Sequence, residues 1–287
     1  MQTVASLDPL RRAVETLRHD GAIALVPTMG ALHEGHLTLV RQARKRAAHA
    51  VVSIFVNPRQ FGANEDLDSY PRQLEQDCNL LKEEGVSLVW APTAETMYPQ
   101  GYATNISISG VSEGLCGGTR PGHFDGVATV VCKLFNQVRP DLAFFGEKDW
   151  QQLAVIRRMA HDLNLSLPSA ESIIGVETVR EADGLAMSSR NAYLSPEDRS
   201  RAAALPGAMR NAIADMENGA DAAESLAILS NCLTDAGFAS IDYAELRDAA
   251  TLKPLQVIEN KPARLLVAAR IGPARLIDNM PVCGKKH

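Results

Sequence analysis

Two histidines separated by two residues stand in the loop Pro27-Thr28-Met29-Gly30-Ala31-Leu32-His33-Glu34-Gly35-His36. The loop follows a short apolar run, residues 22–26, and precedes an amphipathic segment, residues 35–47, so we expect a strand, the loop and then a helix. A helix N-terminus presents free N–H groups and a partial positive charge, which suits phosphate. Glycines at positions 30 and 35 let a nucleotide approach the backbone closely. The loop is therefore a candidate phosphate-binding site.

His33 and His36 lie three residues apart, which places them on one side of a helical turn. Both imidazoles can then touch nucleotide phosphates and stabilise the charge on a departing pyrophosphate. Two close histidines can also bind zinc, although no third ligand stands nearby with suitable spacing. They can equally be solvated surface residues. The order of strand, HxGH and helix favours the phosphate interpretation, because it resembles the nucleotidyltransferase group that also contains the class I aminoacyl-tRNA synthetases.

Polar residues follow a second expected strand, residues 51–56. Asn57-Pro58-Arg59-Gln60 offers amides that can bind a small polar acid, or it is simple turn chemistry from Asn-Pro. The next stretch, residues 62–70, is polar and acidic, and we expect a mobile lid there. Asp77 falls in an expected helix, residues 72–84, where it lies either near magnesium or on a solvated helix face.

Two later segments carry charge suited to nucleotides. Gly146-Glu147-Lys148-Asp149 follows an expected strand, residues 141–145. Lys148 can act as a point charge on phosphates, and Asp149 can accept from ribose hydroxyls or cap the next helix. Met187-Ser188-Ser189-Arg190 combines two hydroxyl donors with a guanidinium. Taken alone, this second segment is a common type of loop.

The pattern of apolar runs predicts the elements that position these residues. Strands at 22–26, 51–56, 86–90 and 141–145 alternate with helices at 35–47, 72–84, 126–138 and 150–163, which indicates an α/β fold with a Rossmann-like parallel sheet. Such sheets bind ligands beyond the carboxyl ends of their strands. Further on we expect two helices, 196–218 and 220–236, and antiparallel strands at 240–247, 265–271 and 275–278. The predicted domains are residues 1–178, which bind the nucleotide and acid, a smaller α+β lid domain at 179–283, and a disordered tail at 284–287.

Composition limits the function classes. The chain has 287 residues, 46% of them hydrophobic, and a net charge of -5, which disfavours a nucleic-acid-binding surface. The longest apolar runs are too short to span a bilayer. Residues 1–10 lack the apolar core of a signal peptide, and the five scattered cysteines form no CxxC pair. We therefore expect a cytoplasmic protein with free thiols and no membrane or nucleic-acid partner.

Five segments resemble the pantothenate synthetase family in order and spacing, namely PTMGALHEGHLTLV, FVNPRQFGANEDLDSYPR, RPGHFDGVATVV, FFGEKDWQQL and READGLAMSSRNAYL. The resemblance covers nearly the whole chain. It implies an ATP-dependent ligase that uses Mg²⁺, adenylates pantoate, joins it to β-alanine and releases AMP and pyrophosphate. It also implies a homodimer.

The resemblance also implies roles for individual residues. Gln60 and Gln152 would hold pantoate, together with Asn57. Asp77 would lie near magnesium, and Val179 would contact adenine through its backbone. Arg120 and His123 would shape the acid site. The residues implied in catalysis are His33, His36, Lys148 and Arg190. Those implied in ATP binding are Met29, Gly30, Ala31, Leu32, His33, Glu34, Gly35, His36, Gly146, Glu147, Lys148, Asp149, Val179, Met187, Ser188, Ser189 and Arg190.

Two other functions remain open on the residues alone. A simple nucleotidylyltransferase would transfer AMP and stop there, so its product would keep the nucleotide. A non-catalytic ATP-sensing module would bind the nucleotide tightly without turnover. The sequence offers no GxSxG motif and no cysteine beside a plausible base, so it does not indicate a covalent nucleophile.

Overall fold

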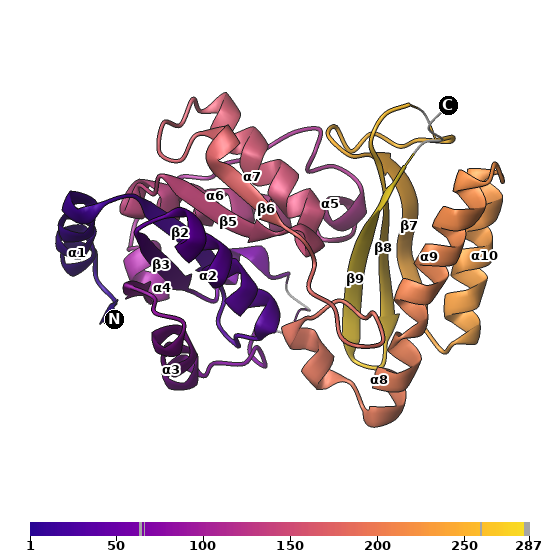
Figure 1. Cartoon of the computed structure of the whole chain (residues 1–287), viewed down its shortest axis with the longest axis horizontal. Helices are drawn as coiled ribbons and strands as arrows, with labels where there is room; N and C mark the ends of the chain where they lie inside the picture. Colours follow the sequence, from indigo (N-terminus) through magenta and orange to yellow (C-terminus); the bar gives the residue numbers. More distant parts are fainter. Residues whose placement is uncertain (63–64, 66, 259, 284–287) are drawn as a thin grey trace. The chain divides into compact units, whose positions relative to one another are not determined.

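The computed structural model describes residues 1–62, 65, 67–258 and 260–283, and the chain divides into two compact units (Figure 1). The first unit contains residues 1–112, 120–147 and 152–177. The second contains residues 113–119, 148–151 and 178–287. The predicted tail, residues 284–287, and part of the predicted lid, residues 63, 64 and 66, lie outside the described residues. The domain boundary at residue 178 and the domain roles attached to it stay predictions.

The first unit is built on a six-stranded sheet in the order β1-β4-β3-β2-β5-β6, and every neighbouring pair is parallel. The predicted α/β fold is therefore confirmed. The four strands expected from apolar runs are present with slightly shifted ends, and two short strands that we did not predict flank them at the sheet edges. The strands are β1 (Gln2–Val4), β2 (Ile23–Thr28), β3 (His49–Ile54), β4 (Leu88–Trp90), β5 (Leu142–Gly146) and β6 (Ile173–Val176).

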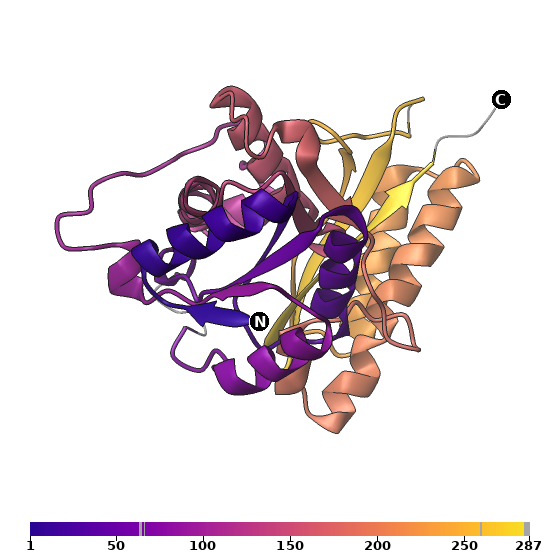
Figure 2. The same ribbon diagram turned by 60° about the vertical axis from the view of Figure 1, so that its left-hand side comes forward.

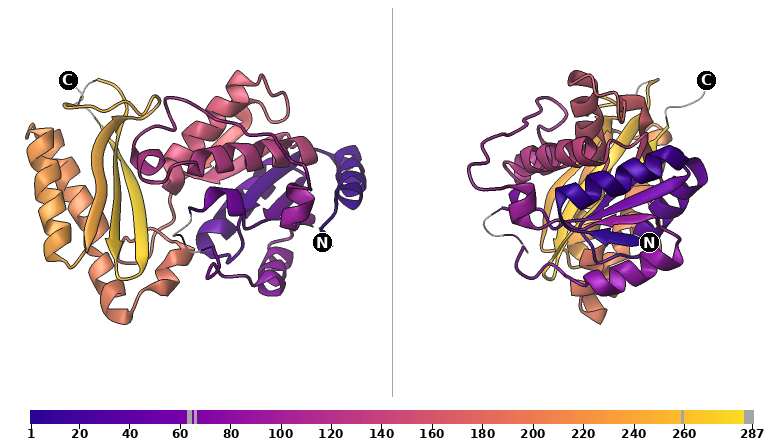
Figure 3. Two further views of the ribbon diagram at one scale, coloured as in Figure 1. Left: turned by 180° about the vertical axis from the view of Figure 1, so that it is seen from behind. Right: turned by 90° about the vertical axis from the view of Figure 1, so that its left-hand side faces the viewer.

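Helices cover both faces of this sheet. Successive residues of a strand point to opposite faces, so Ala24 and Val26 pack with Val40 of α2 in one core cluster, while Ile23 and Leu25 point to the other side. Figure 1 shows α2 in front of the strands, and the back view in Figure 3 brings α6 in front of them. The α-helices of this unit are α1 (Leu7–Asp20), α2 (Glu34–Arg46), α3 (Leu74–Glu83), α4 (Ala94–Met97), α6 (His123–Val138) and most of α7 (Trp150–Asp162).

The strand order places a switch point at β2. The chain leaves β2 for β3 on one side, whereas β5 pairs with the other side of β2 at Ala24 and Leu25. Open parallel sheets bind ligands at such a point, beyond the carboxyl ends of the strands. The loops that follow β2 and β5 therefore border the expected crevice. Figure 2 shows that the segment after α4 runs as an extended loop outside the sheet.

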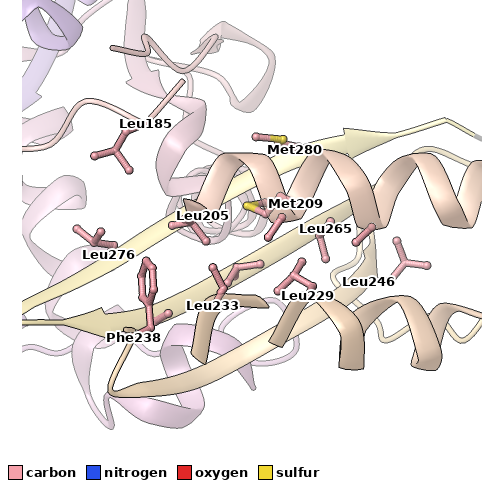
Figure 4. Packing of buried hydrophobic residues seen from close by; sticks show 14 of the residues in the cluster. Leu185, Leu205, Met209, Leu229, Leu233, Phe238, Leu246, Leu265, Leu276 and Met280 are labelled. Atoms are coloured by element: carbon pink, nitrogen blue, oxygen red, sulfur yellow. The ribbon is translucent and has the colours of Figure 1, made fainter. Parts of the chain in front are cut away.

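The second unit contains a short helix, α5 (Leu115–Thr119), and an antiparallel sheet of β7 (Ser240–Asp248), β8 (Ala263–Ile271) and β9 (Ala274–Val282). Helices α9 (Ala204–Glu217) and α10 (Ala222–Asp235) pack side by side on one face of this sheet (Figure 1). Figure 4 shows the core between them, where side chains from both helices meet those of the strands, among them Leu205, Met209, Leu229, Leu233, Leu246 and Leu265.

One expected helix of this unit is wrong in detail. The segment 196–218 is interrupted at Ala203, so that a short helix α8 (Pro196–Ala202) precedes α9. Pro206 lies in the first turn of α9, where its missing N–H is not needed for an intrahelical bond. Within the described part of the chain, no helix has the length and apolar character required to cross a bilayer.

Candidate active site

The loop after β2 is held from beneath by one buried carboxylate. Asp77 of α3 is fully buried, and its two oxygens accept the backbone N–H groups of Ala31 at 3.0 Å and Leu32 at 2.9 Å. Gly30 has φ +84°, and a Cβ there would lie 2.9 Å from an Asp77 oxygen, so the approach requires glycine. Ala31 also adopts a positive φ of 50°. The loop conformation therefore depends on a residue 46 positions away in sequence.

This arrangement does not favour Asp77 as a direct ligand of magnesium. Its carboxylate oxygens are occupied by backbone donors, and residues 1–62, 65, 67–258 and 260–283 contain no group of three or more His, Cys, Asp or Glu side chains that could hold a metal ion. A solvated helix face, the alternative for Asp77, is wrong because the side chain is buried. No sequence pattern pointed to its role in holding the loop.

The two histidines form a reciprocal cap at the start of α2. His33 is the N-cap, and its Nδ1 accepts from Gly35 N at 3.2 Å, while Nδ1 of His36 accepts from His33 N at 3.4 Å. The ring centroids are 4.1 Å apart. A neutral imidazole whose Nδ1 accepts a hydrogen bond carries its proton on Nε2. The caps therefore assign both rings as Nε2–H donors.

The end of β5 contributes open backbone on the other side of the switch point. No described atom lies within 4 Å of the position that a Cβ on Gly146 would take. The following turn, η2 (Glu147–Asp149), leads into α7. Glu147 packs close to Gly175 of β6, where a Cβ would lie 3.0 Å from a Glu147 oxygen. Gly146 therefore leaves space beside the backbone where a ligand can approach.

The turn after β3, η1 (Pro58–Gln60), places Gln60 in a fixed network. The Asn57 side chain is buried, and its Nδ2 donates to Gln60 Oε1 at 3.2 Å and to Gly126 O at 3.1 Å. Its Oδ1 accepts from Arg59 N and from the Tyr98 hydroxyl. Asn57 therefore orients Gln60 rather than presenting a free amide.

Helix α6 clamps the same turn through its backbone. A Cβ on Gly126 would overlap the Arg59 carbonyl oxygen, so only glycine allows this contact. The carbonyl of Gln60 accepts from His123 Nδ1 at 2.8 Å and from Arg120 Nη2 at 3.3 Å. Sequence reasoning placed Arg120 and His123 near the acid site but did not identify their contact with the Gln60 carbonyl.

Arg120 also binds a carboxylate in the loop 62–70. Its Nε donates to Glu65 Oε1 at 2.6 Å, and its Nη2 contacts Glu65 Oε2. Burial raises the pKa of Glu65, but the hydrogen bond and charge of Arg120 outweigh burial and leave that pKa below its ordinary value. Arg120 therefore links Glu65 of the predicted lid, by an ion pair, to the Gln60 carbonyl, by a hydrogen bond.

A cavity of about 400 Å³ lies in the first unit beside this turn. It extends from the β2 loop at Met29 and Gly30 to Pro58 of the turn and to Arg72 and Leu74 at the start of α3. Its walls also include the end of β3 at residues 54–56 and the end of β4 at residues 91–92. The cavity thus lies at the carboxyl ends of the strands, where parallel sheets bind small molecules.

Lys148 belongs to the second unit, because the segment 148–151 packs with the C-terminal sheet. Trp150 Nε1 donates to Ala249 O at 2.9 Å, and the Arg264 guanidinium stacks 3.5 Å from the Trp150 ring centroid. Lys148 Nζ lies 3.8 Å from Asp149 Oδ2. The charge of Lys148 is therefore attached to a firmly packed turn.

Two adjacent glutamines of α7 differ in environment. Gln151 is buried and holds the segment 113–119, accepting from Cys116 N at 3.0 Å and donating to Glu113 O and Gly114 O. Gln152, the residue expected to bind pantoate, is half-buried and makes no side-chain hydrogen bond to any residue that the structure describes. Its amide therefore remains available to a ligand.

The second unit also contains the hairpin that carries the serines and Arg190. Met187 N donates to Val179 O at 3.0 Å, and Arg180 pairs with Ala186 in an isolated bridge. Ser188 Oγ caps the turn η4 (Ser189–Tyr193) by accepting from Arg190 N at 3.3 Å. The carbonyl of Val179, expected to contact adenine through its backbone, is thus already bonded within the hairpin.

Comparisons with known proteins agree across the whole chain. Residues 2–281 match the family described as Pantoate-beta-alanine ligase. The chain is 68% identical to a pantothenate synthetase of Novosphingobium aromaticivorans over 98% of this chain and 99% of that protein. It is 58% identical to a pantothenate synthetase of Sphingopyxis alaskensis over 98% of this chain and all of that protein.

Solved structures give the same result for the fold. A pantothenate synthetase from Thermus thermophilus superposes with a TM-score of 0.91 at 47% identity, covering 99% of this chain and all of that one. A pantoate-beta-alanine ligase from Francisella tularensis, solved in complex with beta-gamma ATP and beta-alanine, superposes with a TM-score of 0.81 at 32% identity, covering 98% and 97% of the two chains.

Proposed function

This chain belongs to the pantoate–β-alanine ligase family, and we propose that it condenses pantoate with β-alanine through a pantoyl adenylate. The pantoate carboxylate attacks the α-phosphorus of ATP, and the bond to pyrophosphate breaks. The β-alanine amine then attacks the acyl carbon, loses a proton and displaces AMP. The products are pantothenate, AMP and pyrophosphate.

The tautomer assigned to His33 and His36 carries this proposal. Both Nδ1 atoms accept backbone hydrogen bonds, so both Nε2–H groups are donors before any substrate arrives. Donors fixed in advance stabilise developing charge without the cost of reorganising at the moment of reaction. Their place at the switch point of the sheet supports a role on the phosphates of ATP.

Residues of the second unit supply further charge and hydroxyl donors. We assign Lys148 and Arg190 to the phosphates, and Ser188 and Ser189 to phosphate oxygens. Asp149 is assigned to the ribose. Asp77 does not fit a direct metal ligand, because its buried oxygens accept backbone N–H groups. Mg²⁺ held by the phosphates of ATP would neutralise phosphate charge.

Neutral amides suit the pantoate site. A guanidinium fork would bind the carboxylate strongly and withdraw charge from the attacking oxygens, which favours the ground state. Gln60 and Gln152 orient the acid through single hydrogen bonds and leave it nucleophilic. Asn57 acts on Gln60 rather than on the acid, since its own hydrogen bonds are made within the protein.

One assay separates this function from its alternatives. The protein is incubated with ATP, Mg²⁺ and pantoate, with and without β-alanine, and the exchange of labelled pyrophosphate into ATP is followed together with AMP release. A pantoyl adenylate predicts exchange with pantoate alone and AMP release only after β-alanine is added. Exchange that strictly required β-alanine would contradict the intermediate. A product that keeps the nucleotide would indicate a nucleotidylyltransferase, and tight ATP binding without turnover would indicate a sensor.

The family resemblance also supports a cytoplasmic homodimer. The chain has a mass of 31.0 kDa, so light scattering should report about twice that value for a dimer. A monomer mass at micromolar concentration would contradict the dimer and leave the reaction proposal intact.

A further inference from the structure

Two consecutive residues of β9, Asp278 and Asn279, contact both nucleotide-binding segments of the second unit. These segments are the Lys148 turn and the hairpin that ends at Arg190, and residues 152–177 separate them in sequence. Asp278 and Asn279 are both almost fully buried. Buried polar side chains are found where their hydrogen bonds are made within the protein, so the partners of this pair indicate what it does.

Asn279 holds the Lys148 turn through the backbone. Its Nδ2 donates to Lys148 O at 2.8 Å, which fixes the orientation of the peptide after Lys148 without using the ammonium group. Its Oδ1 accepts from Arg264 Nη1. Arg264 in turn stacks 3.5 Å from the ring centroid of Trp150, two residues beyond Lys148. The turn is therefore held on both sides of its peptide.

The register of the sheet explains why these groups meet. Asn279 pairs with Leu266 of β8, and Arg264 lies two residues from Leu266 on the same strand. Residues two apart share a face of the sheet, so Arg264 and Asn279 are diagonal neighbours. An asparagine at this position can accept from Arg264 and donate to the turn at the same time, which an aspartate cannot do.

Asp278 holds the hairpin. Its two carboxylate oxygens accept from Arg180 Nη1 at 2.7 Å and Nη2 at 2.9 Å, a bidentate pair. Arg180 Nη1 also donates to Gly184 O at 3.0 Å, and Arg180 bridges Ala186 across the hairpin. Two links join the neighbouring residues: Asn279 N donates to Asp278 Oδ1 at 2.7 Å, and Arg180 Nη2 contacts Asn279 O.

We propose that Asn279 and Asp278 are positioning residues for adenylation, which fix Lys148 and the Ser188–Arg190 hairpin to one strand so that the two charges keep a constant separation. The inference rests on the proposed function. A change of about 1 Å in the position of a catalytic group can cost about 10²-fold in rate, so a small movement of either segment should be visible in kcat. Neither residue touches a reacting atom in this scheme.

The test uses the full chain and pantoate-dependent pyrophosphate exchange. Asn279→Asp keeps the acceptor for Arg264 but places an oxygen against Lys148 O. We expect kcat to fall about 10-fold or more, with ATP affinity by calorimetry changed by less than about 3-fold. Asn279→Ala removes the Nδ2 donor to Lys148 O without adding repulsion, so it should lower kcat by a smaller factor. It replaces Asn279→Asp in the test if the aspartate variant does not fold.

A double-mutant cycle separates positioning from simple stability. If Asn279 acts through Lys148, Asn279→Asp should lower the rate of the Lys148→Ala enzyme by less than about 2-fold. Ser225→Ala is the matched control, because Ser225 is also buried in the second unit and donates to Asp221 O at 2.9 Å on α10. It should lower the Tm and leave kcat unchanged.

The hairpin has a parallel test. Arg180→Lys keeps a positive charge beside Asp278 but loses the two-pronged contact. It should lower kcat by about 10-fold in the wild-type background and by less than about 2-fold in the Arg190→Ala background.

The proposal would be overturned if Asn279→Asp lowered kcat equally in the wild-type and Lys148→Ala enzymes, or if Arg180→Lys did so in the wild-type and Arg190→Ala enzymes. Unchanged kcat in folded Asn279 variants would also overturn it. Absence of pantoate-dependent exchange in the wild-type chain would instead mean that the proposed function itself is wrong, and the positioning role would fall with it.

Discussion

The loop after β2 and the turn after β3 follow adjacent parallel strands, yet they are fixed by groups of opposite polarity. In the loop, the Asp77 carboxylate accepts backbone N–H groups. In the turn, the Arg120 guanidinium and the His123 imidazole donate to the Gln60 carbonyl. Each of the two segments is thus held through its backbone groups.

The difference has a chemical consequence for the two substrates. Because Asp77 uses the amides of Ala31 and Leu32, the groups of this loop that we propose for phosphate are His33, His36 and the first turn of α2. The Arg120 guanidinium and the His123 imidazole hold the carbonyl of Gln60, and the neutral amide of the same residue is the group that we propose for the acid. The same sheet edge therefore presents donors suited to a triphosphate beside an amide suited to a carboxylate.

Breaking the Asp77 contact should have the largest effect. Asp77→Ala leaves two buried N–H groups without acceptors, at about 1–3 kcal/mol each, so unfolding free energy should fall by about 2–6 kcal/mol. Exchange activity should be lost in parallel, since the loop carries both histidines. Denaturant unfolding and pyrophosphate exchange measure the two effects. A stable, active Asp77→Ala enzyme would show that the loop conformation is set elsewhere.

His36→Ala should affect chemistry more than folding. Losing one fixed donor costs about 10²-fold or more in rate, whereas the lost cap costs about 1 kcal/mol of stability. Exchange kinetics and thermal unfolding of the same sample separate the two. Near wild-type turnover in a folded His36→Ala protein would remove His36 from the catalytic set.

Gly126→Ala should displace the turn after β3, because Gly126 of α6 packs directly against its backbone. The added Cβ would overlap the Arg59 carbonyl oxygen, and overpacking of this kind costs about 1–3 kcal/mol. We expect a higher KM for pantoate and a smaller change in the KM for ATP. Gly207→Ala in α9 is the control, because no described atom lies within 4 Å of the added Cβ; there the helix should be stabilised by up to about 1 kcal/mol. Equal effects on both substrates would mean that the turn serves the whole site.

The smallest effect concerns pH. Burial raises the pKa of Glu65 in the folded protein, but the hydrogen bond and charge of Arg120, with smaller contributions from Gly62 N and His123, together outweigh burial and lower that pKa. The stabilisation from this pair is therefore fully present above the ordinary glutamate pKa and is lost as pH falls through the lower folded value. Glu65→Gln should lower the Tm slightly at neutral pH, and the difference from wild type should vanish in acid. A constant difference down to about pH 3 would assign it to packing.

Sequence patterns predicted the elements with strong apolar runs and missed those whose signal is short. The strands β1 and β6 are three and four residues long, too short for alternation to stand out. The break at Ala203 was missed because alanine favours helix on both sides of it. The site loops were predicted because polar residues at the carboxyl ends of parallel strands must gather at one edge.

The contacts that hold the site loops were not predictable in the same way. In the sequence, Asp77 is an ordinary acidic residue of an expected helix. Nothing in its spacing predicts that it accepts hydrogen bonds from the backbone N–H groups of Ala31 and Leu32, 46 and 45 residues earlier. Asn279 lies in a strand with no motif around it. Such contacts depend on packing between distant segments, which local periodicity does not encode. The roles assigned to Gln60, Gln152, Lys148 and Arg190 stay predictions.

The membership of residues 113–119 and 148–151 in the second unit bears on how the chain folds during synthesis. When residues 1–177 have left the ribosome, all strands of the first sheet exist, but the Trp150 indole and the Lys148 carbonyl still lack Ala249 and Asn279, which are synthesised later. Domains synthesised first generally fold first. Here the Lys148 turn completes its contacts only when β9 has been synthesised, so this turn becomes ordered after the sheet that precedes it. A truncated chain ending before β9 would therefore keep the Rossmann-like sheet and lack an ordered Lys148.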